Sequence, residues 1–436
     1  MENTKNKVTE FLKKNNMHPE QIDMEDCCNI FLDQMQRGLT AQESSLEMIP
    51  TYLEIQKDVP TNEQVVVIDA GGTNFRVATV HFNENKQAVI ENLQLHRMPG
   101  VDKQVSKEDF FETMAGYVED VVDISPNIGF CFSYPTEISP NKDGRLIRFS
   151  KEIKAEKVEG QMIGENLNAA LNSLGHKGQK HIVILNDTVT TLLAGRVTSF
   201  SKNYDSFVGF ILGTGTNLAY IENNRNITKK PELDPEASQI INTESGGFAK
   251  APMGAIDKQF DKSTKNPNEH TFEKMISGAY LGPLSLMTIQ AAAKDNLFSD
   301  EVFKELTNLS ELSTKDINDF LHKPKGGDNP LSEAVVDSDA DRVILLGLIE
   351  AIVDRAAKLT AINLSSAVLK SDKGQDPNCP VCIVAEGTTF YKLKDFQSKV
   401  ESYLQQYLVE QKERFYEIIG VENATLIGAA IAGLTN

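Results

Sequence analysis

Basic side chains are scarce in this sequence. It has 44 Lys and Arg residues against 62 Asp and Glu residues, which gives a formal net charge of -18. Proteins that bind nucleic acid or an anionic membrane surface need patches rich in Lys and Arg, so this shortage argues against both kinds of partner. A phosphate site is still compatible with the charge, because backbone N–H groups alone can bind an anion.

Cysteine is also sparse. The sequence has five, namely Cys27, Cys28, Cys131, Cys379 and Cys382. An odd, small number in a chain of 436 residues does not form a disulfide framework. Cys379 and Cys382 make a C-x-x-C pair, but a zinc site would need a second pair. A buried strand is therefore favoured here over a zinc or redox site.

Long apolar runs are absent as well. No stretch approaches the ~20 residues of a membrane-spanning helix, and residues 1–16 lack the apolar segment and cleavage site of a signal peptide. These absences predict a cytoplasmic protein without a membrane partner. At roughly 150 residues per domain, the chain length predicts two or three domains.

Apolar runs alternate with amphipathic segments in the centre of the chain, which predicts an α/β fold. Predicted strands cover residues 65–69, 75–82, 127–134, 181–185, 207–223 (with a turn) and 381–387. Predicted helices cover residues 107–121, 164–174, 189–199, 271–294, 297–309, 340–369, 393–413 and 424–435. Residues 223–240 read as polar turns. The first 55 residues read as helices whose apolar faces contain Val8, Phe11, Leu12, Cys28, Ile30, Phe31 and Met35.

Two segments have matching form: IDAGGTN at residues 68–74 and ILGTGTN at residues 211–217. Each predicts a hairpin whose glycine turn lets the backbone approach a phosphate, with successive N–H groups forming an anion site. Thr73, Thr214 and Thr216 could add hydroxyl donors. An ordinary hairpin remains the alternative for either one alone. Together they favour two phosphate sites on two related lobes that face one another.

Two aspartates can carry chemistry beside these turns. Asp69 precedes the first glycine pair and could hold Mg²⁺, usually through water. Asp187 lies in Asn186-Asp187-Thr188, which follows an apolar strand and opens a helix. Helix capping alone would explain one of these three residues. At the carboxyl edge of a strand, however, a carboxylate can accept the proton of a hydroxyl that attacks a γ-phosphate.

Other polar residues at strand ends could bind a polyol, which needs many directed hydrogen bonds. They are Ser133, Ser150, Lys151, Asn217 and Glu244.

These motifs resemble the hexokinase family. Its first phosphate motif is close to D-x-G-G-T-N-F-R, which stands here at residues 69–76. Its N-D-T, G-T-G-S/T-N and N-T-E motifs correspond to residues 186–188, 213–217 and 242–244. Further similar stretches are residues 132–135 followed by Ser150-Lys151, residues 273–282, residues 354–357 and the adenosine motif at residues 386–388. The matches run in family order from about residue 65 to the C-terminus.

The resemblance implies a two-lobe, actin-like (ribonuclease-H-like) α/β ATPase fold with extra helices and a cleft between the lobes. The small lobe would comprise residues 55–190 and 420–436, and the large lobe residues 1–54 and 191–419. The implied activity is hexokinase, ATP:D-hexose 6-phosphotransferase. It would use ATP and Mg²⁺ to convert glucose, and also mannose, to the 6-phosphate as the entry step of glycolysis.

The resemblance also implies roles for individual residues. Asp187 would be the general base and Lys151 would lie near the transferring phosphate. The hexose would be bound by Ser133, Ser150, Lys151, Asn186, Asp187, Asn217 and Glu244. ATP would be bound by Asp69, Gly71, Gly72, Thr73, Asn74, Arg76, Gly213, Thr214, Gly215, Thr216, Gly387 and Thr388, with Asp69 holding Mg²⁺ through water.

Some positions depart from the family pattern. Pro283 stands where a second sugar-binding Glu is expected after Tyr-x-Gly, and Glu386 where Asp is more common. Ser245 replaces a Trp, and the chain has no Trp at all. Glu152-Ile153 replaces Gly-Phe. We expect these changes to weaken discrimination around O1 and O2 of the sugar.

Two other functions stay open at this point. One is a catalytically weak or inactive sugar or nucleotide sensor on the same fold. The other is an actin-like filament ATPase, although such a protein is not expected to carry the sugar elements. For the hexokinase interpretation we expect a monomer or a homodimer.

Overall fold

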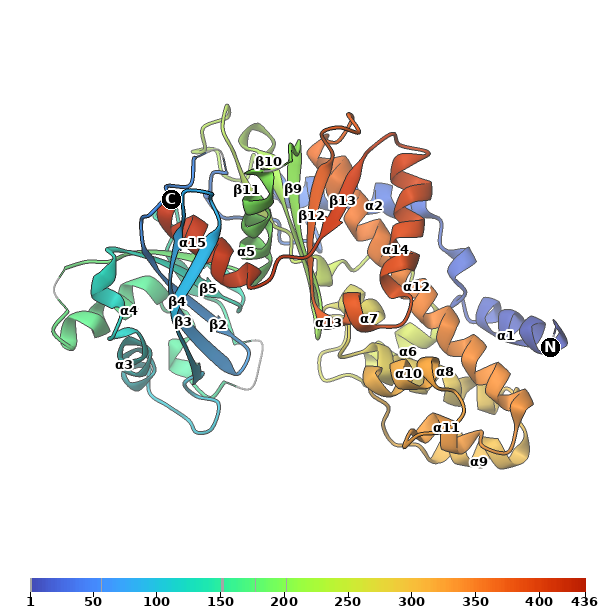
Figure 1. Ribbon diagram of the computed structural model, residues 1–436. Helices are drawn as coiled ribbons and strands as arrows, with labels where there is room; N and C mark the ends of the chain where they lie inside the picture. The colour runs from blue at the N-terminus through green and yellow to red at the C-terminus, as the bar shows by residue number, and fades with distance from the viewer. Residues whose placement is uncertain (1, 56, 150–152, 177, 201) are drawn as a thin grey trace.

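The computed structural model describes residues 2–55, 57–149, 153–176, 178–200 and 202–436. Two sheets stand side by side (Figure 1), one of five strands in the order β4-β3-β2-β5-β8 and one of six in the order β1-β11-β10-β9-β12-β13. The strands are β1 (Ile49–Pro50), β2 (Val65–Gly71), β3 (Asn74–Phe82), β4 (Ala88–Arg97), β5 (Asn127–Phe132), β6 (Thr136–Ile138), β7 (Gly144–Leu146), β8 (His181–Leu185), β9 (Ser206–Leu212), β10 (Thr216–Asn223), β11 (Ser238–Asn242), β12 (Val381–Glu386) and β13 (Tyr416–Ile419).

Both sheets repeat one connectivity. In the first, β2, β3 and β4 form an antiparallel meander, and β5 and then β8 add in parallel on the other side of β2. In the second, β9, β10 and β11 form the meander, and β12 and β13 add in parallel beside β9. The matching hairpins thus occupy equivalent places. The two-lobe α/β architecture expected from the sequence is confirmed, while the predicted lobe limits remain a prediction.

Two helices lie between the sheets (Figure 1): α5 (Asp187–Ala194) and α15 (Ala424–Thr435). They are in close contact with each other, and α15 also packs on β2 and β5. Glycine permits this approach, because a Cβ on Gly428 would overlap the carbonyl oxygen of Thr190 and a Cβ on Gly129 would overlap that of Ala429. The small-residue composition of α15 is therefore required by its position.

The remaining helices belong mainly to the larger half of the molecule. They are α1 (Glu2–Lys14), α2 (Met24–Leu39), α3 (Lys107–Val118), α4 (Ile163–Ser173), α6 (Ala255–Ser263), α7 (Thr271–Ile276), α8 (Leu281–Lys294), α9 (Asp300–Asn308), α10 (Thr314–His322), α11 (Pro330–Ala334), α12 (Asp339–Ser371), α13 (Thr388–Lys392) and α14 (Phe396–Leu404). Of these helices, α3 and α4 accompany the five-stranded sheet in the described part of the chain (Figure 1). The long helix α12 is buried along most of its length and forms the axis of the larger core.

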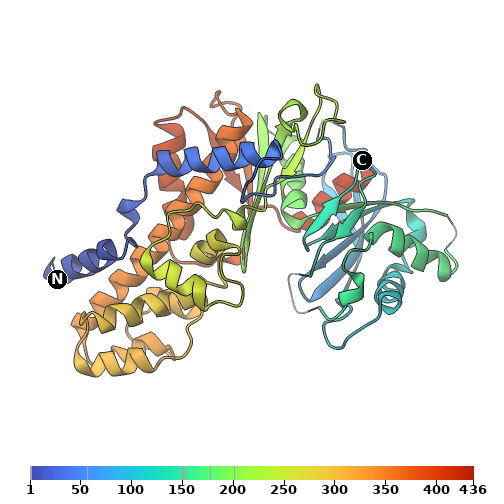
Figure 2. The same cartoon turned by 180° about the vertical axis from the view of Figure 1, so that it is seen from behind.

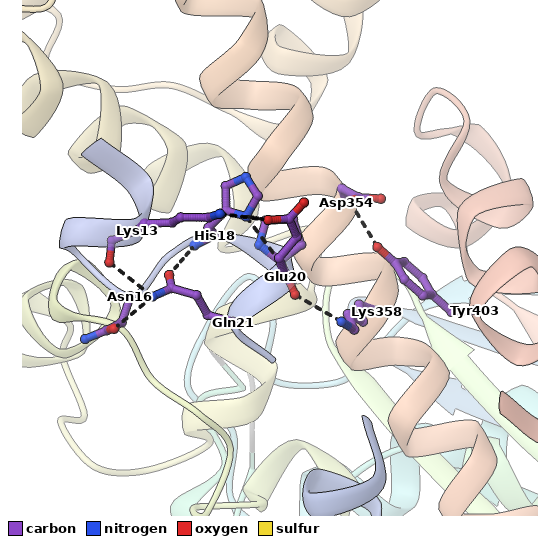
Figure 3. A network of polar contacts seen from close by, with 9 residues as sticks. Lys13, Asn16, His18, Glu20, Gln21, Asp354, Lys358 and Tyr403 are labelled. Carbon is purple, nitrogen blue, oxygen red and sulfur yellow. Dashed lines mark hydrogen bonds and ion pairs between the residues drawn. The ribbon is translucent and has the colours of Figure 1, made fainter. Parts of the chain in front are cut away.

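The N-terminal segment crosses α12, as the rear view shows (Figure 2). A polar network joins it to α12 and α14 (Figure 3). The Lys358 ammonium on α12 donates to the carbonyl of Pro19 at 3.1 Å, and the Tyr403 hydroxyl on α14 donates to Asp354 at 3.0 Å. The side chain of His18 accepts from the Glu20 N–H at 3.3 Å. The Lys358 contact ties the short turn that follows α1 to α12.

Most predicted elements are present, with instructive differences. Ile30 is 43% exposed, so its assignment to the buried face of α2 is wrong. The helix predicted over residues 271–294 is interrupted between α7 and α8. Strands β4 and β11 lie where no strand was expected, and β11 falls partly within a stretch read as polar turns.

The cysteines agree with their structural interpretation. All five lie in the described part of the chain, and none forms a disulfide. The buried-strand prediction is confirmed for Cys382, which is buried in β12, and is wrong for Cys379, which is half-buried and precedes that strand. Among the described residues, no helix is long and apolar enough to cross a membrane.

Candidate functional site

The first hairpin turn is built by the ends of β2 and β3. Gly71 pairs with Asn74, leaving a two-residue turn in which Gly72 has a φ of 62°. Glycine adopts this left-handed conformation without steric cost, as such tight hairpins require. The Tyr134 hydroxyl donates to the carbonyl of Gly72 at 2.8 Å, which holds the turn from below. Ser133 lies against Gly71, since a Cβ on that glycine would be 3.4 Å from the Ser133 hydroxyl.

The negative charge of Asp69 is balanced by Arg76 at this turn. Its Oδ2 forms an ion pair with Arg76 and accepts a hydrogen bond from the Thr425 hydroxyl at 2.9 Å. Arg76 also donates to Thr425 at 3.0 Å. Thr425 lies in the first turn of α15. A helix at the C-terminal end of the sequence therefore contacts Asp69 in the first hairpin. Oδ1 faces Gly71, at 3.7 Å from where a Cβ would be.

The second hairpin turn, between β9 and β10, is closed by its own backbone and by neighbours. The Gly213 N–H donates to the Gly215 carbonyl at 2.9 Å. Gly278 and Ala279 donate their N–H groups to the carbonyls of Gly213 and Thr214 at 2.8 and 3.0 Å. These two bonds take the backbone out of helical geometry and explain the break between α7 and α8. The turn is thus anchored to the start of α8.

Thr216 differs from its predicted role as a phosphate ligand. Its hydroxyl donates to the carbonyl of Ile211 at 3.0 Å, and its N–H donates to Oε2 of Glu273 at 3.0 Å. The residue is 7% exposed. Thr216 therefore stabilises the turn, and its hydroxyl is not directed at the phosphate site. Thr214 and Thr73, by contrast, are exposed at the tips of their turns.

Asp187 is the first residue of α5, at the carboxyl end of β8. The capping interpretation is correct for its neighbour, because Oδ1 of Asn186 accepts from the Thr188 N–H at 2.8 Å. Asp187 follows this cap and lines a cavity of about 360 Å³ between the sheets. The cavity is lined by Asp69, Gly71, Asn74, Arg76, Ser133, Asp187, Ile211, Glu386, Gly387 and Thr425.

Amides and carboxylates from the six-stranded sheet continue the site beside Asp187. The Asn217 amide donates to Asn242 at 2.8 Å, and reaches Asn186 and Glu244 at 3.4 Å each. Asn242 donates to Oε1 of Glu244 at 2.8 Å. Burial raises the pKa of Glu244 to about 7, against the opposing hydrogen bond from Asn242. The nearby negative charge of Asp187 acts in the same direction as burial.

A further carboxylate, that of Glu273, reaches the same region. A Cβ on Gly215 would lie 2.6 Å from its Oε2, and its charge contributes to the raised pKa of Glu244. Pro283, in contrast, lies on α8 and lines a separate cavity. The weaker discrimination around O1 and O2 of the sugar that we expect from Pro283 stays a prediction. Glu273 is a carboxylate of the region around Glu244 to which the sequence gave no role.

The end of β12 closes the other side of the first cavity. Gly387 has a φ of 113°, and a Cβ there would overlap the carbonyl of Leu212, so only glycine fits. Burial raises the pKa of Glu386, and the positive charge of Arg76 opposes that shift. The Thr389 hydroxyl donates to the Gly213 carbonyl at 2.8 Å. Residues 386–389 thus flank the second turn.

A larger cavity of about 850 Å³ begins on the far side of that turn. Its wall includes Gly278 and Ala279, the residues whose N–H groups bind the second turn. The rest of the wall comes from α6, α8, the start of α10 and the loop before it.

The structure brings together most of the predicted site residues. Ser150 and Lys151, predicted for the sugar and the transferring phosphate, lie outside the described residues. Three residues of the site were given no role by the sequence: Thr425, Glu273 and Asn242. Asn242 and Glu273 lie within stretches that resemble the family motifs, so the sequence could have pointed to them. For Thr425 the signal in the sequence was its position at the start of a predicted helix.

Comparisons with known proteins agree with this geometry. Two family models described as hexokinase match residues 7–197 and 207–435. The chain belongs to the hexokinase family. Glucokinase-1 of Kluyveromyces lactis is 30% identical over 84% of this chain and 85% of its own length. Hexokinase-5 of rice is 30% identical over 85% of this chain and 78% of its own length.

Solved hexokinase structures share the fold. A Schistosoma mansoni hexokinase complexed with glucose has 23% identity and a TM-score of 0.76, covering 99% of both chains. Another hexokinase crystal structure has 21% identity and a TM-score of 0.79 over 98% of this chain and 99% of its own. Membership of the hexokinase family makes this chain a sugar kinase that uses ATP.

Proposed function

We propose that this chain transfers the γ-phosphoryl group of Mg²⁺-bound ATP to the 6-hydroxyl of glucose, giving glucose 6-phosphate and ADP, as the entry step of glycolysis. The observation that carries the proposal is the position of Asp187. Its carboxylate faces the cavity that Asp69 and Arg76 line, and lies beside the amides and carboxylates of the larger sheet. A hydroxyl bound there is within reach of both a base and a phosphate.

In the proposed step, Asp187 accepts the proton of the 6-hydroxyl as that oxygen attacks the γ-phosphorus. A new O–P bond forms, and the bond from the γ-phosphorus to the bridging oxygen of ADP breaks. Oδ1 of Asp187 accepts from the Thr188 N–H at 2.8 Å, which fixes the carboxylate at the start of α5. Ser150 and Lys151 complete the proposed set beside the transferring phosphate.

The proposed hexose site consists of Ser133, Asn186, Asn217 and Glu244 with the addition of Asn242 and Glu273. Amide donors and carboxylate acceptors in one buried cluster suit the several hydroxyls of a hexose. Pro283 supplies no carboxylate at the position expected for a second sugar-binding Glu. We therefore propose glucose as the first substrate and mannose as a second one.

The proposed phosphate site lies between the two turns. Backbone N–H groups of the turn from Gly71 to Asn74 and of Thr214 would cradle the phosphates, and Arg76 would add charge. Asp69 fits a role in holding Mg²⁺ through water, because Oδ1 faces the turn while Oδ2 is already paired. When bound, Mg²⁺ supplies positive charge to the phosphate oxygens.

The adenosine would extend past the second turn. Gly387 and Thr388 border that turn on one side, and the 850 Å³ cavity begins on the other at Ala279. We assign the base of ATP to this cavity, which has room for it.

The test is ADP release from the purified protein with Mg²⁺ and ATP, measured with glucose, with mannose and without sugar. We expect release that depends on glucose. Glucose binding without turnover would contradict the proposal and leave a sugar sensor. Equal release with and without sugar would show an ATPase that does not use hexose as acceptor.

A further inference from the structure

The cavity beyond the second turn has an apolar floor. Phe260, Leu286 and Leu312 are 7%, 8% and 3% exposed, and Met287 lies beside them. Among the described residues that line the cavity there is no Lys or Arg. Its shape is fixed, because a Cβ on Gly282 of α8 would overlap the backbone of residues 312–314. A planar ring can therefore be sandwiched there without a nearby cation.

The polar side chains of this cavity are already engaged within the protein. The Gln290 amide nitrogen donates to the carbonyl of Leu309 at 3.0 Å. Ser313 and Asp316 bond one another at 2.6 Å in the cap of α10. The Thr314 hydroxyl accepts from the Gly282 N–H at 2.9 Å.

Three further polar side chains line the cavity. The Ser263 hydroxyl donates to the Phe260 carbonyl at 2.7 Å. Ser310 and Glu311, at the rim, are exposed to solvent. Apart from these two rim residues, each polar side chain of the cavity thus has a hydrogen-bond partner within the protein, in the part of the chain that the structure describes.

We infer that the phosphoryl-donor site does not read the base, so that GTP, ITP, UTP and CTP serve as donors alongside ATP. This inference rests on the proposed function, since it places the base of the donor in this cavity. Bases are distinguished by the donor and acceptor pattern on their edges. A site whose buried polar groups bind a particular pattern rejects others by ~10⁴-fold or more, whereas an apolar pocket discriminates by only ~10–200-fold.

The inference is tested by measuring kcat/KM for glucose phosphorylation with each of the five triphosphates at saturating Mg²⁺. Binding of the β,γ-imido analogues of ATP and GTP is measured in parallel by calorimetry, which does not require turnover. We expect all five triphosphates to fall within about tenfold of one another, and the two analogues to differ in Kd by no more than that.

Two variants sharpen the test. Met287→Trp narrows the cavity, and should raise KM for every triphosphate by a similar factor while leaving glucose affinity unchanged. Gln290→Leu removes an amide that is engaged with the protein, and should leave the ATP-to-GTP ratio unchanged. A shift of that ratio in either variant would show that the cavity reads the base.

The outcomes separate the two proposals. Preference for ATP by more than about 100-fold in both turnover and analogue binding would overturn the inference and leave the proposed function intact. Absence of glucose phosphorylation with any triphosphate would overturn the proposed function, and the analogue affinities would then decide the inference alone. If neither the ATP analogue nor the GTP analogue bound, the inference would be overturned.

Discussion

The two hairpin turns are similar in sequence but are stabilised in different ways. The acidic residue of the first, Asp69, pairs with Arg76 and accepts a hydrogen bond from Thr425. The second lies near the carboxyl groups of Glu244 and Glu273, whose pKa values are raised by burial. Two similar hairpins thus lie in different electrostatic environments: in the proposed function Asp69 holds Mg²⁺ beside the first, and the buried carboxyl groups near the second accept sugar hydroxyls.

The largest effect is expected at the residue between the two environments. Asp187→Asn keeps the size of the side chain but removes the base, so kcat should fall by about 10²–10⁴-fold. Glucose affinity, measured by calorimetry, should change far less, because the base acts mainly in the transition state. Turnover near that of the unchanged protein would remove Asp187 from the mechanism.

The two turns should respond differently to the same substitution. Gly215→Ala places a Cβ 2.6 Å from Oε2 of Glu273 and would displace that carboxylate from the Thr216 N–H. We expect glucose affinity to fall by about tenfold or more, since a buried charged hydrogen bond contributes ~1.5–3 kcal/mol. Gly71→Ala and Gly213→Ala are matched controls, because their Cβ atoms would meet nothing closer than 3.4 and 3.7 Å. Equal losses in all three variants would contradict the distinction.

A change at Arg76 should affect only the phosphate side. Arg76→Met removes the partner of Asp69 and a positive charge from the cavity. We expect KM for ATP to rise by about tenfold or more, with glucose affinity unchanged, since bonds to charged groups contribute ~1.5–3 kcal/mol. Thr425→Val, which removes only a hydroxyl, is the milder comparison. Loss of glucose affinity in Arg76→Met would mean that the two environments are not separate.

The smallest effect is expected from pH. Glu244, with a pKa of about 7, must be ionised to accept a sugar hydroxyl, so glucose affinity should rise by roughly tenfold from pH 6 to pH 8. The contribution of Glu244 to the stability of the fold depends on pH in the opposite direction. The folded-state pKa exceeds the unfolded value, so Glu244 favours the unliganded fold below pH 4.5, and this contribution is lost as pH rises toward 7. Glucose titrations across this range should show the effect, and Glu244→Gln should bind more weakly but without that dependence.

Local patterns predicted the hairpins and the position of Asp187 at the start of a helix, because both depend on short-range sequence. Gly72 needs a left-handed conformation and Asp187 follows a buried strand, and each signal is contained in a few neighbouring residues. The interruption after α7 could not be predicted in this way, because Gly278 and Ala279 leave the helix to bind a turn more than 60 residues earlier in the sequence. The sequence gave no role to Glu273 for a related reason, because its carboxylate accepts from the N–H of Thr216 in that distant turn.

The strands missed by the sequence also have a physical explanation. A β-bulge interrupts the pairing of β4 with β3. The alternation of apolar and polar residues along β4 is therefore broken at Asn92. Leu93 and Leu95 remain 55% and 67% exposed on this edge strand, which obscures the pattern of a buried face. Strand propensity depends on such packing more than on residue type.

The position of α15 has a consequence for the synthesis of the protein. The five-stranded sheet is complete at residue 185, but the helix that packs on β2 and β5 lies at residues 424–435. During translation the ribosome must produce the whole of the second sheet and its helices before that face of the first sheet can be covered. The early half of the chain therefore emerges with exposed apolar strands, and is the part on which we expect chaperones to act.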